Sequence, residues 1–376
     1  MERGPAVSPA PPASSRLLSI DALRGFDMFW IIGGEEVVRA VAHWANWRYA
    51  DELNLQLEHV EWAGFRFYDL IFPLFLFVVG AVLPFSLASH QQKGESTPRI
   101  YWRILRRTVV LFVLGLLYNN ILRFDFANLR IAGVLQRIAI CYGIAAVIVL
   151  HTKWRGQAVI IAALLLGYWA LLAFVAAPGE SAGDYSKEHN LAGYVDRHYL
   201  PGKIYKDYYE FGDNEGILST IPAVATALLG ALAGQWLRSG HTPAWKVLGL
   251  LLAGVACLAI GYGWSYSFPI IKNLWTSSFV LFAGGWSLLL LAFFYGVIDV
   301  LGFRWWAFFF VVIGSNAILA YMAEKFVDFH YTANFLFGGA AKHAGTFAPV
   351  ILTSGVLLLK WLLLLYLYRR KLFLRV

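Results

Sequence analysis

Apolar runs of about 20 residues recur along the whole chain, and they constrain its fold more than any other feature. That is the length an α-helix needs to cross the hydrocarbon core of a bilayer. We count ten such runs, at about 19–38, 65–89, 103–122, 132–150, 157–177, 216–236, 246–266, 275–299, 304–327 and 347–368. The sequence therefore predicts an all-α, polytopic membrane protein with about ten transmembrane helices.

Charged residues are scarce for a soluble protein. Of the 376 residues, 59% are hydrophobic and 14% are charged, whereas soluble domains carry about 25% charged residues. A net charge of +8 would indicate a nucleic-acid partner in a soluble chain. Here an excess of Lys and Arg in short cytoplasmic loops explains it better. The expected partner is therefore the lipid bilayer and not nucleic acid.

The loops between the runs divide by charge. On one side they are rich in basic residues, among them Lys93, Arg99, Lys153, Arg155, Arg238, Lys246, Arg304, Arg369 and Arg370. On the other side they hold most of the acids, among them Asp51, Glu52, Glu180, Asp184, Glu188, Asp207 and Glu210. Because short basic loops stay in the cytoplasm, the pattern predicts that both termini lie inside.

A single transmembrane domain is expected over residues 19–376. Residues 1–18 are rich in Pro, Ala and Ser and predict a disordered cytoplasmic tail. The longest break between runs, about 178–215, faces outside and is either a lid or binding loop or a solvated cap. Cys141 and Cys257 fall inside apolar runs, which indicates buried small hydrophobes and neither a disulfide nor a metal site.

A histidine and a carboxylate lie close together where a polar loop meets an apolar run. The stretch at residues 59–84 reads H-V-E-W-A-G-F-R-F-Y-D-L-I-F-P-L-F-L-F-V-V-G-A-V-L-P. His59 can titrate near neutral pH and can act as a general base. Asp69 is costly in a membrane helix unless it is paired or faces a wet cavity. The alternative is that His59 is an ordinary interfacial residue beside Trp62.

Further polar residues map to the outer ends of several runs. They are Gln136, Arg137, Asp213, Glu215, Lys272 and Asn273, and Glu35 follows two glycines at the outer end of the first run. Residues of this kind at one depth predict a polar cavity open to the outer side. For Asp213 and Glu215, capping of a helix N-terminus is the simpler alternative.

Arginines gather at the inner ends of the runs. Arg103, Arg106 and Arg107 open the third run and either set its orientation or bind the phosphates of a nucleotide-bearing donor. Asp21 and Arg24 are spaced for a structural ion pair on one helix face. Asn316 lies near mid-membrane in the ninth run. The whole pattern suits a group transfer across the membrane, and it suits a transporter equally well.

Five ordered segments carry a resemblance to a known family. They are S-I-D-A-L-R-G-F-D-M-F-W-I-I-G-G, the stretch from His59 to Gly80, L-R-I-A-G-V-L-Q-R-I, D-N-E-G-I-L-S-T-I and P-I-I-K-N-L-W-T-S-S. Together they resemble the heparan-α-glucosaminide N-acetyltransferase family. The closest likeness is to its bacterial members, some of which are labelled N-acetylglucosamine-related inner-membrane proteins. The resemblance runs from Arg16 to the end of the chain.

The resemblance implies a transmembrane acyltransferase bundle in a bacterial inner membrane. It implies transfer of acetyl from cytosolic acetyl-CoA, as co-substrate, to the amine of a glucosamine-type sugar or glycan on the periplasmic side. It implies no metal, and related enzymes indicate a homodimer. In the family the essential histidine lies in a loop with the pattern His-x-x-Trp-x-Gly before an Asp-Leu-x-Phe-Pro helix. The matching residues are His59, Trp62, Gly64, Asp69, Phe72 and Pro73.

The resemblance gives His59 the catalytic role, and the leading hypothesis, a glucosaminide N-acetyltransferase, assigns roles to the other candidate residues. His59 is the general base or a transient acetyl carrier, and Asp69 and Glu35 hold His59 or the cationic substrate. Glu35 stands where the lysosomal members carry an asparagine, so the acceptor is open. The expected acceptor site holds Glu35, Trp62, Gln136, Arg137, Asp213, Glu215, Lys272 and Asn273. Of these, Gln136, Arg137, Lys272 and Asn273 are expected to stabilise the thioester oxygen as charge develops on it. The expected donor site holds Arg103, Arg106, Arg107 and Asn316.

Two rival functions remain at this point. One is a transporter of N-acetylglucosamine or a related amino sugar, which would release no thiol from acetyl-CoA. The other is an O-acetyltransferase acting on an envelope glycan, which would share the donor and accept a sugar that lacks an amine.

Overall fold

The computed structural model describes residues 17–204 and 209–374. Within these residues the chain is all-helical, and extended backbone pairs only at two isolated bridges, Ala63 with Ile271 and Arg130 with Gly202. The predicted fold class, a polytopic helical membrane protein, is confirmed. The disordered tail predicted for residues 1–18 falls almost entirely outside the described residues.

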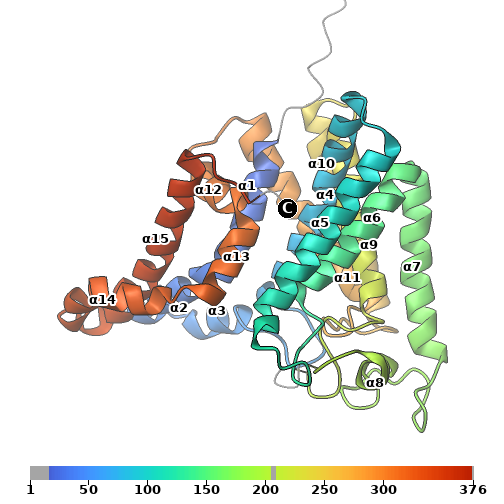
Figure 1. The fold of residues 1–376 in the computed structure, drawn as a ribbon, viewed down its shortest axis with the longest axis horizontal. Coiled ribbons are helices and arrows are strands. Elements are labelled where there is room, and N and C mark those ends of the chain that lie inside the picture. The colour runs from blue at the N-terminus through green and yellow to red at the C-terminus, as the bar shows by residue number, and fades with distance from the viewer. Residues whose placement is uncertain (1–16, 205–208, 375–376) are drawn as a thin grey trace, which may run out of the picture.

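Fifteen α-helices make up this part of the chain (Figure 1). The first eight are α1 (Leu18–Phe29), α2 (Glu35–Trp44), α3 (Ala50–Gln56), α4 (Ile71–Gln92), α5 (Thr97–Tyr118), α6 (Val134–His151), α7 (Trp154–Phe174) and α8 (Leu191–Tyr199). The others are α9 (Thr220–Arg238), α10 (Pro243–Trp264), α11 (Ser277–Phe294), α12 (Ala307–Ser315), α13 (Ala317–Phe326), α14 (Phe329–Lys342) and α15 (Ala348–Arg369). A 3₁₀ turn, Phe67–Leu70, leads into α4.

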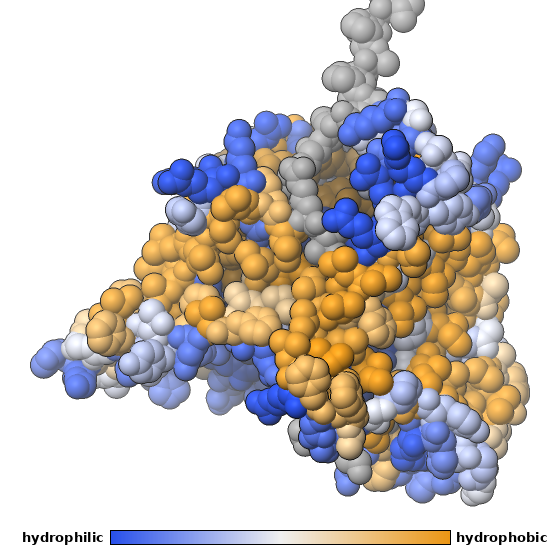
Figure 2. Space-filling model, in the orientation of Figure 1, coloured by the Kyte–Doolittle hydropathy of each residue, from blue (hydrophilic) through white to orange (hydrophobic). Residues whose placement is uncertain are grey.

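Seven helical segments are long and apolar enough to cross a membrane, judged by length and composition. They are Phe67–Gln92, Val134–His151, Trp154–Phe174, Thr220–Arg238, Pro243–Trp264, Ser277–Val300 and Gly345–Arg369. An eighth is the pair α12 and α13, which bends by 68° at its break. Figure 2 shows an apolar belt around the middle of this face of the molecule, between two polar ends.

Helices also cover the other two predicted runs, but they do not meet the same criterion. The first run is α1 and α2, joined through a π-helical segment, Trp30–Gly34, in which Gly33 has a φ of 113°. The third run is α5, whose first half carries four arginines. The count of ten spans and the orientation therefore stay predictions.

Two ends of the molecule are distinguished by their loops. The basic end comprises residues 93–96, 152–153, 239–242, 301–306 and 370–374. The loop end comprises residues 45–66, 119–133, 175–204, 209–219 and 265–276. In Figure 1 the loop end, with α8, lies at the bottom and the basic end at the top.

Helix α4 lies at the centre of the bundle and crosses α9 at very short range. A Cβ atom added at Gly80 would meet the Ala227 carbonyl oxygen at 1.8 Å, and one at Gly230 would meet the Phe77 carbonyl oxygen at 1.9 Å. Small residues at a crossing let two membrane helices approach closely. This contact fixes the helix that directly follows Asp69.

The segment between α7 and α9 folds over the loop end. Trp62 donates from its indole nitrogen to the Tyr185 carbonyl oxygen over 2.8 Å, and its ring packs against Tyr209. Asn190 donates to the Tyr209 hydroxyl over 2.6 Å. The long outer segment is thereby tied to the loop that carries His59.

Candidate functional site

His59 and Asp69 form a hydrogen-bonded pair at the loop end of α4. His59 Nδ1 lies 2.8 Å from Asp69 Oδ1. The other carboxylate oxygen of Asp69 accepts the backbone N–H groups of Val60 (3.4 Å) and Arg66 (3.1 Å). Because Asp69 is fully buried and accepts these bonds, it acts as a carboxylate that receives the Nδ1–H of His59. The lone pair of the imidazole is then on Nε2.

Lys272 completes a triad with this pair. Its Nζ lies 2.8 Å from His59 Nδ1, 3.3 Å from His59 Nε2 and 3.3 Å from Asp69 Oδ1. Since Nδ1 already donates to Asp69, Lys272 acts on the ring as a neighbouring charge. The two loops are held together by the bridge between Ala63 and Ile271, and by the Gly64 N–H, which donates to the Ile270 carbonyl oxygen over 2.9 Å.

The surroundings keep His59 neutral. Burial lowers the pKa of the imidazole, and the charge of Lys272 lowers it further, against the opposing effect of the Asp69 bond. Burial also lowers the pKa of Lys272, and Asp69 opposes that shift. The His59 side chain is 30% exposed, so the neutral ring is accessible. A neutral, oriented and accessible imidazole has the properties of a general base.

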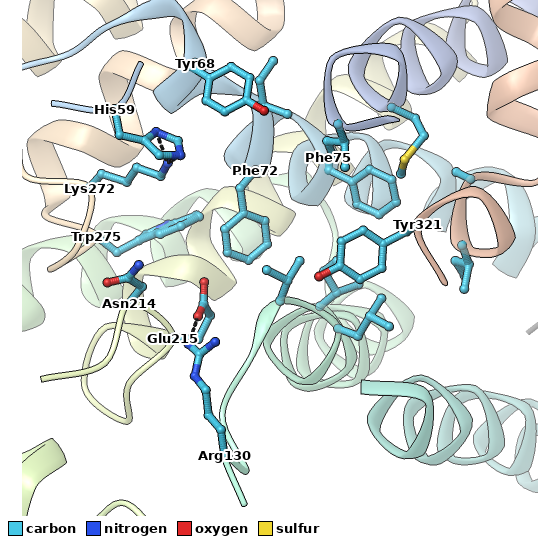
Figure 3. A pocket seen from close by; sticks show the side chains of 18 residues that line it. His59, Tyr68, Phe72, Phe75, Arg130, Asn214, Glu215, Lys272, Trp275 and Tyr321 are labelled. Atoms are coloured by element: carbon cyan, nitrogen blue, oxygen red, sulfur yellow. Dashed lines mark hydrogen bonds and ion pairs between the residues drawn. The ribbon is translucent and has the colours of Figure 1, made fainter. Parts of the chain in front are cut away.

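His59 and Lys272 of this triad border a cavity of about 440 Å³, which we call the outer cavity (Figure 3). That volume lies within the range of about 300–1,000 Å³ found for small-molecule sites. Its lining is mostly apolar and aromatic, with a few polar groups. The lining residues are Met28, Ile31, His59, Tyr68, Ile71, Phe72, Phe75, Arg130, Val134, Leu135, Ile138, Asn214, Glu215, Lys272, Trp275, Ala317, Ile318 and Tyr321.

Arg130 and Glu215 lie across the outer cavity from His59 and Lys272 (Figure 3). Arg130 donates from Nε to Asp213 Oδ2 over 2.9 Å and from Nη2 to Asp213 Oδ1 over 2.6 Å, and it also pairs with Glu215. Hydrogen bonds to these carboxylates raise the pKa of Arg130 further. Glu215 lines the cavity, whereas Asp213 is buried behind Arg130.

Arg137 supports the cavity from behind. It is buried and donates to Ser219 Oγ and, over 3.3 Å, to the Gly216 carbonyl oxygen. Its guanidinium lies 5.0 Å from the centroid of the Trp275 ring, on which it can stack. Trp275 itself lines the cavity.

Four other predicted acceptor-site residues do not line the outer cavity either. Gln136 is buried where α6 packs against Gly115, and Asn273 is buried beside Lys272 in sequence. Trp62 points to the segment between α7 and α9. Glu35 contacts the cavity only through Tyr68, to which it is hydrogen-bonded. The Tyr68 ring lines the cavity, and its centroid lies 5.0 Å from that of the His59 ring.

A second cavity, of about 240 Å³, lies toward the basic end, and we call it the inner cavity. Its polar lining includes Arg24, Arg107 and Asn316. Five residues, Phe75, Leu135, Ile138, Ala317 and Ile318, line both cavities, so the two are separated by a wall one side chain thick. The Nε atom of Arg107 is buried and has no hydrogen-bond partner among the described residues.

The other predicted donor-site arginines lie away from the inner cavity. Arg103 is exposed and donates to Glu95 over 2.8 and 3.1 Å, and Arg106 is exposed as well. Asn316 lines the inner cavity, but its side-chain amide is hydrogen-bonded to the backbone of the C-terminal segment.

The residues described by the structure include no cluster of three or more His, Cys, Asp or Glu side chains that could hold a metal ion.

Sequence reasoning overlooked Arg130, Tyr68 and Tyr321. Arg130 stands seven residues before Arg137, and both belong to the same quoted segment. A signal was available, because the buried acids Asp213 and Glu215 require a cation at the same end of the molecule. Aromatic residues such as Tyr321 carry no such signal in a chain with 19 tyrosines.

Comparison with known proteins places two relatives beside this chain. The heparan-alpha-glucosaminide N-acetyltransferase of Homo sapiens is 26% identical over 428 aligned residues, which cover 98% of this chain. The protein of the same name from Mus musculus is 26% identical over 420 aligned residues, covering 96% of this chain. The chain spans about 60% of the length of each relative. No family model matches the chain. The resemblance drawn from the motifs is confirmed by these relatives.

Proposed function

From this similarity, we propose that the protein is a membrane-embedded acetyltransferase. It moves acetyl from acetyl-CoA to the amine of a glucosamine-type sugar. The observation that carries the proposal is the His59–Asp69–Lys272 triad on a cavity that abuts a second, arginine-bearing cavity from the opposite end. The names of the relatives supply the reaction class, and the triad supplies a base for it.

His59 takes the proton that the reaction releases. The amine nitrogen attacks the thioester carbonyl carbon, the C–S bond breaks, and CoA leaves as a thiolate. The proton lost from nitrogen passes to Nε2 of His59 and then to the thiolate, which gives the N-acetyl sugar and free CoA. Asp69 holds the tautomer that carries the lone pair on Nε2 and stabilises the imidazolium that forms.

Lys272 has two roles in this proposal. Its charge keeps His59 neutral before the reaction. It also stabilises the negative charge that develops on the thioester oxygen, because a fixed cation in a water-poor site is worth more than one in water. Its Nζ reaches both ring nitrogens of His59, so it lies close to the place where that oxygen would be.

The position of Lys272 favours direct transfer over a covalent intermediate on His59. An acetyl group on Nε2, with Nδ1–H held by Asp69, would make the ring a lasting cation beside the Lys272 ammonium, whose Nζ lies 3.3 Å from Nε2. The two positive charges would repel each other, whereas in direct transfer the imidazolium passes its proton on to the thiolate. We therefore expect acetyl-CoA alone to give no burst of free CoA, whereas a burst equal to the enzyme concentration would establish His59 as an acetyl carrier.

The donor site is assigned to the inner cavity. Arg24 and Arg107 line it and are suited to the phosphates of CoA, in place of Arg103 and Arg106. The buried Nε of Arg107, which has no partner among the described residues, fits an anionic ligand there. The pantetheine arm would pass the shared wall toward His59. The acceptor enters from the loop end, with Glu215, Tyr321 and Trp275 available to hold its hydroxyl groups and ring.

Two cavities that share a wall also suit a transporter, so the test must separate transfer from transport. Purified protein is given acetyl-CoA with glucosamine, N-acetylglucosamine or glucose, and free thiol and acetylated sugar are measured. We expect thiol release and N-acetylglucosamine formation with glucosamine alone. Release with glucose would make the protein an O-acetyltransferase. Saturable sugar binding without release would favour the transporter.

A further inference from the structure

The chain turns back on itself where α15 ends. Lys371 has a φ of 56°, in the left-handed region, and its N–H donates to the Tyr368 carbonyl oxygen over 3.0 Å. The Leu372 N–H donates to the Leu367 carbonyl oxygen over 2.9 Å. These two bonds form a Schellman motif, which ends a helix and reverses the chain direction. The following residues run back into the space between α1 and α5 (Figure 1).

Asn316 holds this segment by both atoms of its side-chain amide. Its Nδ2 donates to the Leu372 carbonyl oxygen over 3.0 Å, and its Oδ1 accepts the Leu374 N–H over 3.0 Å. Asn316 is 2% exposed and lies at the 68° break between α12 and α13. A buried amide that meets both a donor and an acceptor on one backbone segment fixes that segment in register. We call residues 372–374 the C-terminal strap.

The strap forms part of the inner cavity wall. Phe373 and Leu374 line the cavity together with Arg24, Arg107 and Asn316. With the strap seated, the volume of about 240 Å³ is below the range of about 300–1,000 Å³ for small-molecule sites. A nucleotide-bearing thioester is at the large end of such ligands. With the strap seated the inner cavity is too small to enclose a ligand of that size, so enclosing it requires the strap to shift.

We propose that the C-terminal strap is a gate on the donor cavity, with Asn316 as the positioning residue that holds it closed. This inference rests on the donor site proposed above. Asn316, which the sequence assigned to the donor itself, then acts through the backbone of the strap. Lys371 is the hinge. Its left-handed backbone conformation is strained for a non-glycine residue, and opening of the strap relieves that strain.

Accessibility of a cysteine inside the cavity tests the gate. Ser315 lines the inner cavity, and Ser315→Cys places a thiol there. Cys257→Ala removes the half-buried native thiol, and Cys141 stays buried. The rate of alkylation is measured for the full chain, for a chain ending at Lys371, and for Asn316→Ala. We expect both changes to raise the rate about tenfold. Lys371→Gly removes the strain at the turn and is expected to lower the rate, and Lys342→Met, on the exposed surface of α14, serves as the control near the parent rate.

Added CoA separates the gate from the proposed donor site. We expect CoA to slow alkylation in every variant, and the KM for acetyl-CoA to fall in the chain ending at Lys371 while the KM for glucosamine stays unchanged. Equal alkylation rates in the full and shortened chains would overturn the gate. A raised rate that CoA fails to slow would leave the gate standing and overturn the donor assignment. Because shortening removes no part of α15, it remains informative if Asn316→Ala does not fold.

Discussion

The charge on His59 is decided by the residues that touch it. Asp69 favours the protonated ring, while burial and Lys272 oppose protonation and prevail, so the pKa of His59 lies below its ordinary value of about 6.5. A base with a lowered pKa stays unprotonated at neutral pH. The rate of a reaction that uses it falls as the pH drops through that pKa.

Replacing Lys272 is expected to move the acid limb of the pH–rate profile. Lys272→Met removes a nearby positive charge, so the pKa of His59 rises and the limb shifts to higher pH. The profile of kcat/KM against pH measures this shift. Lys342→Met, on the exposed surface of α14, is the control and leaves the profile unchanged. A limb that stays in place or moves to lower pH would contradict the assigned role.

A second titrating residue lies in the segment between α7 and α9. Burial raises the pKa of Asp196 to about 6, although its carboxylate accepts the backbone N–H groups of Ile217 and Asp213. A carboxyl whose pKa is raised on folding stabilises the fold below its unfolded pKa of about 4, and that contribution is lost as the pH rises through 6. The loop end is therefore less stable at pH 8 than at pH 5.

Asp196→Asn is expected to reduce this pH dependence, because an amide does not ionise. The melting temperature of the purified protein at pH 5 and pH 8 measures it. The wild type should lose several degrees between the two, and the variant should lose less. Asp184→Asn, in the same segment and little buried, is the matched control. An identical loss in wild type and Asp196→Asn would rule out Asp196 as the source.

At the scale of elements, α4 depends on its close crossing with α9. Gly80→Val would drive a side chain into the backbone of Ala227 and force the helices apart. Overpacking of this kind costs about 1–3 kcal/mol, and more where backbone must move. We expect a loss of folded protein on size-exclusion chromatography or a melting temperature lowered by several degrees. Gly167→Val, at a position with open space around it, should have little effect.

The sequence could predict which elements exist but not how they are rotated. Apolar runs fix the depth of a residue in the membrane, and depth placed His59, Asp69, Lys272 and Glu215 at one end. Depth does not say which side of a helix faces the centre. For that reason Gln136 and Arg137 were expected to line the outer cavity, and they do not. Arg130, which lies in the loop before α6, lines it instead.

The inner arginines show the same limit. Three arginines lie within about one turn of each other on α5, at positions 103, 106 and 107. Of these, only Arg107 lines the inner cavity. Arg24 was expected to be an ion-pair partner of Asp21, and the structure shows that contact at 3.7 Å, yet Arg24 also lines the cavity. Which faces meet is set by packing such as the crossing at Gly80, and no single-sequence pattern encodes it.

At the scale of the whole molecule, an apolar belt separates two chemically different ends (Figure 2). The lysines and arginines of the short loops predict that the basic end faces the cytoplasm. In whole cells, an impermeant thiol reagent should label Ala182→Cys, at the loop end, and should not label Gly240→Cys, at the basic end. The reverse pattern would contradict the predicted orientation and the direction of transfer.

The central claim is that His59 removes the proton from a sugar amine that attacks acetyl-CoA. Glucosamine-dependent release of free CoA, measured for the wild type, His59→Ala and His189→Ala, tests it most directly. His189 is an exposed histidine paired with Glu180 at the loop end and serves as the control. The account predicts release by the wild type and by His189→Ala, and a loss of about 10²–10⁴-fold in His59→Ala, the usual worth of a general base. Undiminished release by a folded His59→Ala would contradict it.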